Sequence, residues 1–301
     1  MSSIKRLGSI FQYIHQHPLA GKHKSRAYYK FFRWQLMSRL KPGVHKVKFV
    51  GDTVLIVDRN MKGATGNIYL GLHDFNDMTF LIHFLRSDDL FIDIGANVGS
   101  YTILAAGVSK ASCISFEPVP FTYQSLLQNV RANSLEDKVQ CLNKGVGGGG
   151  GFLYFTKAYD CVNHVIPEKS IQDFSKVVQV PVVALDEVCN SVNKPMLIKI
   201  DVEGFETEVL RGMNQLLANN YLKGIIIELN GSGARYGYNE SDLHHLLLSN
   251  GFKPYTYDGF KRELTLVDSF GSFNTIYLKD IQFVQQRLSS APTIHLFSEN
   301  F

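Results

Sequence analysis

The sequence predicts an α/β protein with an open, mostly parallel, doubly wound sheet that carries helices on both faces. Short apolar runs such as Phe91–Ile94, Cys113–Phe116 and Val139–Leu142 alternate with segments whose apolar residues recur at helical spacing. Polar or acidic residues directly follow these runs. In such sheets ligands bind at the carboxyl ends of the strands, so we expect the functional residues there.

The composition is that of a folded globular chain. The 301 residues are 45% hydrophobic, which suits one large domain with additions or two small domains. No apolar run approaches the roughly 20 residues that span a bilayer, and the N-terminus lacks the apolar core of a secretory signal. The four cysteines and ten histidines show no metal-site spacing. These features predict a cytoplasmic protein with reduced thiols.

Positive charge is concentrated at the N-terminus. Of the 31 lysines and arginines, eleven precede the first acid, Asp52, and the 27 acids outnumber the cations that follow. Residues 1–43 show two helical patterns separated by Pro18 and Gly21. We expect a basic helical appendage packed on the core with a solvated side. The alternative is a surface that makes weak contact with anionic lipid, nucleic acid or an acidic glycan.

The following region leads into the main sheet. Partial alternation over Val44–Val57 predicts a hairpin. The glycines Gly63, Gly66 and Gly71 predict a loop. Apolar residues at helical spacing predict a helix over Phe75–Arg86.

The stretch Phe91–Thr102 is the centre of the predicted site. Its apolar strand is followed by a turn between Gly95 and Gly99, where the backbone comes close to another group. Ser100 can cap the next helix, and it stands where a dinucleotide fingerprint has its third glycine. No G-K-[ST] phosphate loop is present. The carboxylate of Asp93 can instead hold the ammonium of an amino-acid moiety.

A second acid points to the other half of the ligand. Glu117 ends the next strand and is placed to accept both hydroxyls of a ribose. An amino acid joined to adenosine is S-adenosylmethionine, which we predict as the cofactor. The alternative is that Asp93 and Glu117 only form hydrogen bonds within turns.

The second half of the chain continues the alternation. Five consecutive glycines, Gly147–Gly151, predict a flexible turn, and the polar insertion Lys157–Lys176, which contains His164, is a plausible lid over the acceptor. Further strands are expected at Val178–Val183, Met196–Asp201 and Gly224–Ile227, with helices around Phe205–Met213 and up to Asn250–Gly251. The last strands, Phe252–Tyr257 and Asn274–Leu278, are expected to be antiparallel to each other.

The strand that ends at Asp201 carries the predicted chemistry. Alternate strand residues share a face, so Lys199 and Asp201 point the same way. A carboxylate there can take a proton from a hydroxyl. Glu203 can cap the next helix or orient the acceptor, and Glu228 on the neighbouring strand is a further candidate. The alternative is a structural ion pair between Lys199 and Asp201. Metal assistance through Asp201, Glu203 and Glu228 is a further alternative, but these acids match no hard-cation motif, so we expect no metal.

Four motifs in one order resemble the FkbM-type methyltransferase family. They are D-x-G-A-N-x-G, F-E-P, L-D and I-K-I-D-V-E-G-x-E, found at Asp93–Gly99, Phe116–Pro118, Leu185–Asp186 and Ile198–Glu206. The resemblance spans about residues 74–251. It implies a class I Rossmann-like fold, S-adenosylmethionine as methyl donor and usually an oxygen acceptor, such as a hydroxyl of a sugar, polysaccharide or natural product.

The resemblance also implies roles for further residues. Ala96 and Asn97 belong to the cofactor turn, Asn143 stands where a family member contacts the adenine edge, and an acid near the place of Asp74 lies over the cofactor. A helix cap is the alternative for Asp74. We expect the appendage to end at residue 43, the methyltransferase domain to cover residues 44–280, and a tail to cover residues 281–301.

Three other functions compete with methyl transfer to a hydroxyl acceptor. A nucleic-acid methyltransferase could use the basic N-terminus, but amino-group enzymes of that kind resemble [DNS]-P-P-[YF], whereas this chain has Asp201-Val202-Glu203-Gly204. A nucleotide-dependent oxidoreductase would need the third glycine. A non-catalytic protein that binds S-adenosylmethionine is disfavoured by the intact acids.

Overall fold

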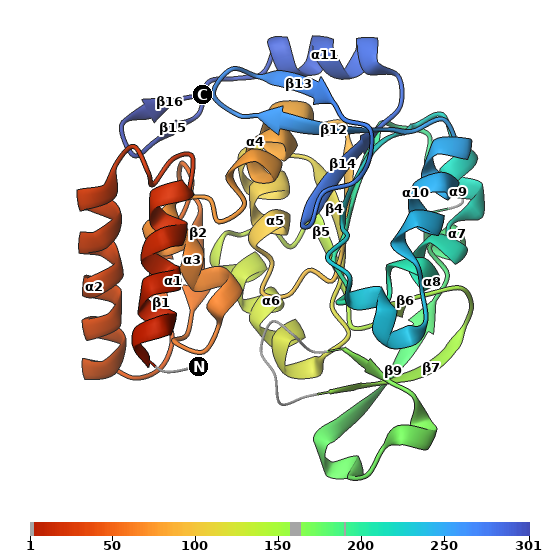
Figure 1. Cartoon of the computed structure of the whole chain (residues 1–301), viewed down its shortest axis with the longest axis horizontal. Helices are drawn as coiled ribbons and strands as arrows, with labels where there is room; N and C mark the ends of the chain where they lie inside the picture. The colour runs from red at the N-terminus through yellow and green to blue at the C-terminus, as the bar shows by residue number, and fades with distance from the viewer. Residues whose placement is uncertain (1–2, 157–163, 190) are drawn as a thin grey trace.

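The computed structural model describes residues 3–156, 164–189 and 191–301 (Figure 1). The described residues contain a central eight-stranded sheet in the order β13-β12-β14-β11-β10-β3-β4-β5. In the same order the strands span Glu263–Leu266, Lys253–Asp258, Asn274–Leu278, Leu222–Glu228, Met196–Ile200, Leu90–Ile94, Ser112–Phe116 and Val139–Leu142.

The five strands from β11 to β5 run parallel to one another, and β14 is antiparallel to both β11 and β12. The chain runs outward from β3 through β4 to β5 and then returns to the other side of β3 as β10. This order confirms the predicted Rossmann-like class with an antiparallel last strand, and it places the reversal of strand order between β3 and β10.

Two apolar clusters cover the two faces of the sheet. Phe91, Leu197 and Ile226 belong to one cluster, and the alternate residues Ile92, Ile198 and Ile225 belong to the other. Phe75–Phe84 (α4), Ser100–Ile103 (α5), a π-helix at Leu104–Val108, Pro120–Ala132 (α6) and Ile281–Ser289 (α11) supply residues to the first cluster. Leu185–Cys189 (α7), Glu206–Arg211 (α8), Asn214–Ala218 (α9) and Glu240–Ser249 (α10) supply the second.

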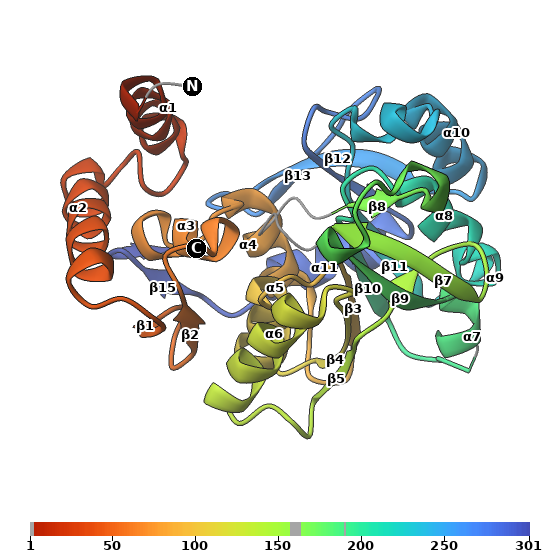
Figure 2. The same cartoon turned by 90° about the horizontal axis from the view of Figure 1, so that it is seen from below.

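A smaller sheet lies beside the carboxyl end of β5 (Figure 2). It has the order β6-β9-β7-β8, with strands at Gly145–Val146, Val177–Val183, Gly151–Thr156 and Val165–Ile166. Short 3₁₀ turns at Glu168–Ser170 and Phe174–Lys176 complete the described part of the insertion that was expected as a lid. Residues 157–163 of that predicted lid lie outside the described residues.

The N-terminal helices pack on the rest of the protein. α1 (Ser3–Gln16) and α2 (Lys24–Leu40) precede the predicted hairpin, β1 (His45–Lys48) and β2 (Val54–Val57). Leu19 and Trp34 belong to the same hydrophobic cluster as the first face of the sheet. The basic segment therefore shares a core with the residues that follow it. No described helix is both long and apolar enough to cross a membrane.

The loop predicted from Gly63 and Gly66 is wrong, because the chain forms helix α3 over Lys62–Leu70. Tertiary contact explains the difference. A Cβ at Gly66 would lie 2.5 Å from Nδ1 of His73, so glycine allows the chain after the helix to come close. Leu70 also packs with Ile14 and Ala27 of the N-terminal helices.

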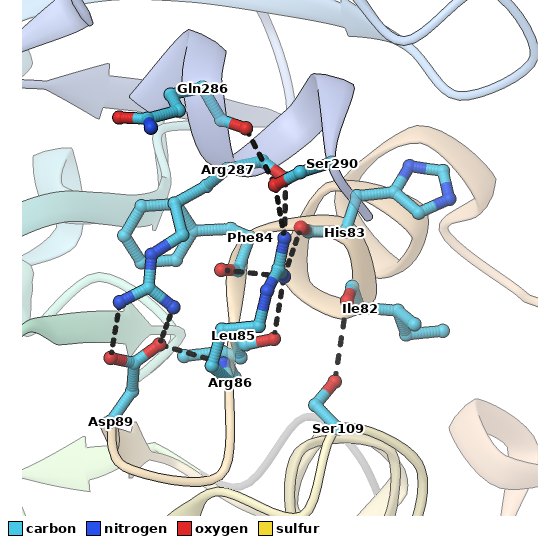
Figure 3. Close-up of polar contacts among 10 residues, drawn as sticks. All are labelled: Ile82, His83, Phe84, Leu85, Arg86, Asp89, Ser109, Gln286, Arg287 and Ser290. Carbon is cyan, nitrogen blue, oxygen red and sulfur yellow. Dashed lines mark hydrogen bonds and ion pairs between the residues drawn. The ribbon is translucent and has the colours of Figure 1, made fainter. Parts of the chain in front are cut away.

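The C-terminal residues, expected to form a tail, form helix α11 and the hairpin β15 (His295–Leu296) and β16 (Glu299–Asn300). Figure 3 shows how α11 is held. Arg287 donates to both carboxylate oxygens of Asp89, at 3.0 and 3.2 Å, and Asp89 is fully buried. Arg86 donates to the carbonyl oxygens of His83, Phe84, Leu85 and Arg287. These bonds tie α11 to the end of α4 and the start of β3.

Candidate active site

A cavity of about 540 Å³ opens where the order of the sheet reverses. β3 and β10 lie side by side there, with Asp93 level with Lys199. At such a point the chain segments that follow the two neighbouring strands leave in opposite directions. The carboxyl ends of the two strands therefore form a crevice. Asp93, Lys199 and Asp201 all line the cavity.

The turn after β3 is held by the end of β4. The backbone amides of Gly95 and Ala96 both donate to the carbonyl oxygen of Phe116, at 3.0 and 2.9 Å. The amide of Asn97 donates to Oε2 of Glu117 at 2.9 Å, and the amide of Val119 donates to Oε1 at the same distance. The predicted cofactor turn and the predicted ribose acid therefore form one hydrogen-bonded unit.

Glu117 is buried but lines the cavity. Burial raises its pKa to about 7, although the two amide donors act in the opposite direction. A carboxylate in this position can accept hydroxyl donors from a ligand in the cavity.

Asp93 is almost completely buried at 1% exposure. It accepts a hydrogen bond of 2.6 Å from Oγ1 of Thr102, which is itself 2.8 Å from Oγ of Ser115. Burial raises the pKa of Asp93, and the nearby ammonium of Lys199 opposes that rise. Thr102 thus fixes one oxygen of the carboxylate that was predicted to hold an ammonium group.

Two predicted cofactor residues lie behind the cavity lining. Gly99 precedes α5 and faces Leu126 of α6. The side-chain amide of Asn143 donates to the carbonyl oxygens of Glu117 and Pro118, each at 2.8 Å. Asn143 therefore braces the ribose-acid turn in this structure. Its predicted contact with an adenine stays a prediction.

The cap predicted at Ser100 is wrong, and the alternative role of Asp74 as a helix cap lacks the side-chain hydrogen bond of a cap. Ser100 is the first residue of α5, and its N-cap is Gly99, because the glycine turn already ends in a left-handed residue. Asp74 occupies the N-cap position of α4, but its side chain accepts a hydrogen bond of 3.1 Å from the hydroxyl of Tyr101. Asp74 also lines the cavity.

Lys199 and Asp201 point the same way, as strand geometry predicted. Nζ of Lys199 lies 2.7 Å from Oδ2 of Asp201 and 4.7 Å from the centre of the Tyr101 ring. Burial opposes the charge on Lys199, but the carboxylates of Asp201 and Asp93 outweigh that effect and raise the pKa of Lys199. The lysine is therefore a fixed cation at the floor of the cavity.

Three carboxylates converge beside this lysine. Oxygens of Asp201, Glu203 and Glu228 lie within 4.8 Å of one another, and all three residues line the cavity. Burial, followed by the charge of Asp201, raises the pKa of Glu203 to about 7 and that of Glu228 to about 8. Groups with these pKa values can exchange protons near neutral pH. The same spacing could hold a divalent cation, and the predicted absence of a metal stays a prediction.

Glu206, the last residue of the strand motif, shapes the turn between Asp201 and Glu203. Its buried carboxylate accepts the backbone amides of Val202 at 3.2 Å and Gly204 at 3.1 Å. Val202 and Glu206 are only four residues apart, so a local sequence pattern can indicate this hydrogen bond.

Sequence reasoning missed the cavity wall that comes from the N-terminus. Tyr13, Gln16 and His17 line the same cavity as the acids. The hydroxyl of Tyr13 donates to the carbonyl oxygen of His73 at 3.0 Å, and Nε2 of His17 is 2.8 Å from the carbonyl oxygen of Leu72. These bonds fix α1 to the loop before Asp74. No local pattern reveals such a long-range contact.

Asp77 and Asn274 complete the polar lining on the other side. The side-chain amide of Asn274 donates to Asp77 at 3.0 Å. Burial, then the charge of Asp74, raises the pKa of Asp77 to about 7. The aromatic rings of Phe75 and Phe273 lie in the same wall, so this part of the cavity combines polar groups with apolar faces.

Comparison with known proteins points to one family. The model of the "Methyltransferase FkbM domain" matches residues 93–254. The "Hexuronic acid methyltransferase AglP" of Haloferax volcanii is 29% identical over 170 residues, which are 56% of this chain and 64% of that protein. The "Methyltransferase sdnD" of Sordaria araneosa is 26% identical over 172 residues, 47% of this chain and 66% of that protein.

The chain thus spans slightly less than two thirds of these relatives. Among solved structures, an rRNA methylase from Streptococcus thermophilus is 12% identical with a TM-score of 0.36, covering 67% of this chain and 93% of that one. Similarity at that level says nothing about the acceptor.

Proposed function

Because this chain belongs to the FkbM methyltransferase family, we propose that it transfers the methyl group of S-adenosylmethionine to a hydroxyl group of a sugar, polysaccharide or natural product. Membership of the family agrees with the family and the cofactor predicted from the sequence. The observation that carries the proposal is that the Asp201–Glu203–Glu228 carboxylates face the same cavity as the cofactor turn.

The cavity residues suit the cofactor chemically. The buried carboxylate of Glu117 provides acceptors for a ribose diol, and Asp93 provides a negative charge for an amino-acid ammonium. Glycine at position 95 lets the cofactor turn pack directly against the end of β10, since a Cβ there would lie 1.9 Å from the carbonyl oxygen of Asp201. Gly95, Ala96 and Asn97 would then border the bound molecule.

The cofactor supplies an electrophilic methyl group on a sulfonium. The residues of the chain have to hold the acceptor oxygen in line and remove its proton. Lys199 fixes one oxygen of Asp201, and Glu228 ends the neighbouring strand. We assign proton acceptance to the Asp201–Glu228 pair, because close carboxyl groups titrate together and share their protons. Glu203 borders the pair and orients the acceptor.

The lining favours a sugar acceptor over an apolar one. Tyr13, Gln16, Asp77 and Asn274 offer hydroxyl, amide and carboxyl groups, which can pair with several hydroxyls of one ligand. The hexuronic acid named for the Haloferax volcanii relative belongs to this chemical class.

Methyl-labelled S-adenosylmethionine and a panel of hexuronic acid glycosides, neutral glycosides and polyhydroxylated natural products test the proposal. We expect label in a product that survives mild alkali, because a methyl ether is stable there. A base-labile product would indicate a methyl ester and move the acceptor to a carboxyl group. Label in nucleic acid alone would favour a nucleic-acid methyltransferase. Cofactor binding without turnover on any acceptor would favour a non-catalytic protein that binds S-adenosylmethionine.

A further inference from the structure

Helix α2 has an apolar face on each side. Its inner face buries Phe31 and Trp34, as a helix on a core should. Its outer face should be polar, but it carries a stripe of large apolar side chains. This outer stripe consists of Tyr29, Phe32, Leu36 and Leu40, which are 66%, 52%, 58% and 67% exposed, and it continues into Val44 at 63%.

The residues of the outer stripe are spaced by three, four and four positions, so they form one line along the helix. Figures 1 and 2 both place α2 at the outer edge of the molecule, beside α1 and α3 and away from the central sheet. A contiguous apolar line in such a place is a typical mark of an interaction surface.

Positive charge surrounds the outer stripe. Exposed cations lie on α2 and on the segment that follows it: Arg26, Arg33, Arg39, Lys41, Lys46 and Lys48. The N-terminal segment has no acid before Asp52. From elsewhere in the described chain, Glu299 reaches this segment and pairs with Lys22 and His23. Within the described residues, Arg33, Lys41, Lys46 and Lys48 form no ion pair.

The outer stripe and the cations around it together favour one partner among those that a basic face can bind. A second copy of the chain would bring two uncompensated positive faces together, which is unfavourable. Nucleic acid would use the cations but would leave Leu36, Leu40 and Val44 in water. An anionic lipid surface uses both features, because the cations meet the headgroups while apolar side chains enter the interface.

We propose that the outer face of α2 binds the surface of an anionic lipid bilayer, with the outer stripe inserted at the headgroup level. The buried inner face keeps α2 on the protein during this contact. The protein would then work at a membrane surface. This inference is independent of the acceptor chemistry proposed above.

Sedimentation with vesicles tests the inference on the full chain. We expect binding to phosphatidylglycerol vesicles at low salt, with affinity at least about tenfold weaker for phosphatidylcholine vesicles and falling steeply with ionic strength. The variant F32S/L36S/L40S should lose at least about tenfold in affinity with its charge unchanged. The variant R33Q/K41Q/K46Q/K48Q should lose a similar amount with its stripe unchanged.

The control variant F152S/L266S removes two other exposed apolar residues, 65% and 56% exposed, from distant strands. It should bind vesicles as the wild type does. Trp34 is the single tryptophan of the chain and lies on the inner face of α2. Its emission spectrum should stay that of a buried indole in every variant, which shows that α2 remains packed.

Several results would overturn the inference. Absence of vesicle binding by the wild type would remove it, as would equal binding by F32S/L36S/L40S. A wild-type dimer in light scattering that becomes a monomer in F32S/L36S/L40S would assign the stripe to a second copy. Tight binding of RNA or DNA that this variant keeps, without vesicle binding, would assign the cations to nucleic acid. Loss of methyl transfer with intact vesicle binding would affect only the proposed function.

Discussion

Gly95 and Asp201 are in direct contact across the reversal of the sheet. A Cβ on Gly95 would lie 1.9 Å from the carbonyl oxygen of Asp201, and the amide of Asp201 donates to the carbonyl oxygen of Ile94 at 3.0 Å. The cofactor turn and the carboxylate cluster, which are about one hundred residues apart in sequence, therefore share a backbone contact. A change in one should move the other.

The first prediction concerns this contact. Gly95 has φ of +80°, so alanine there would be strained as well as in collision with backbone. We expect Gly95→Ala to lower the free energy of unfolding by about 2–5 kcal/mol and to weaken cofactor binding strongly. Urea unfolding and calorimetry with S-adenosylhomocysteine measure both effects. Gly149→Ala is the control, since nothing lies within 4 Å of its Cβ; equal stability of the two variants would contradict the contact.

The strands that build the site were predictable because their signals are local. Apolar runs that end in an acid or a glycine turn identified β3, β4 and β10, and strand alternation placed Lys199 beside Asp201. The general rule for open sheets then located the ligand at the carboxyl ends. The central part of the site therefore follows from short stretches of sequence.

The remaining parts depend on contacts between distant segments. Gly63 and Gly66 signal a loop locally, yet packing against α2 and the approach of His73 stabilise helix α3. The buried pair of Asp89 and Arg287 holds a helix in a segment expected to be a tail. The cavity wall from α1 likewise has no local signal. Propensity is overridden where tertiary contacts decide.

The second prediction concerns Glu117. Because its carboxylate faces the cavity, Glu117→Ala should nearly abolish binding of S-adenosylhomocysteine in calorimetry, while Glu136→Ala at an exposed position should not change it. The pKa of Glu117 is raised to about 7. Ribose hydroxyls donate to the ionised form, so binding should tighten as pH rises through 7. Glu117→Gln should lack this pH dependence. Unchanged affinity in Glu117→Ala would remove the ribose assignment.

The third prediction concerns Asp201. Asp201→Asn keeps the shape but removes the charge that Lys199 faces at 2.7 Å. We expect turnover to fall roughly 10²–10⁴-fold, with cofactor affinity within a few-fold of the wild type. Asp137→Asn, an exposed acid, is the matched control. Full activity of Asp201→Asn together with an inactive Glu228→Gln would move the base entirely to the neighbouring strand.

The fourth prediction concerns the pH profile. The pKa of Glu228 is raised to about 8 by burial and by the charge of Asp201. A base must be deprotonated to act, so kcat/KM should rise with pH through about 8 in the wild type. Glu228→Gln should have lower turnover and should lose this rise, whereas exposed Glu263→Gln should keep it. The same rise in Glu228→Gln would show that another group titrates.

The fifth prediction concerns the wall that α1 contributes. Gln16 lines the cavity near the end of α1, and the bonds of Tyr13 and His17 to the loop at Leu72–His73 hold the helix there. Among the described residues the side-chain amide of Gln16 has no hydrogen-bond partner, so it can meet a hydroxylated acceptor in the cavity. Gln16→Ala should therefore raise the KM for the acceptor about three- to tenfold, since one hydrogen bond contributes about 0.5–1.5 kcal/mol.

The cofactor affinity of Gln16→Ala should remain that of the wild type, which separates a role in acceptor binding from general damage. Gln12→Ala provides the control, because Gln12 is exposed on the same helix one turn earlier and lies outside the cavity lining. Steady-state kinetics with the acceptor identified by methyl labelling would measure both variants. Equal KM values for Gln16→Ala and Gln12→Ala would mean that α1 closes the cavity without touching the acceptor. A weakened cofactor affinity in Gln16→Ala alone would place the end of α1 over the cofactor instead.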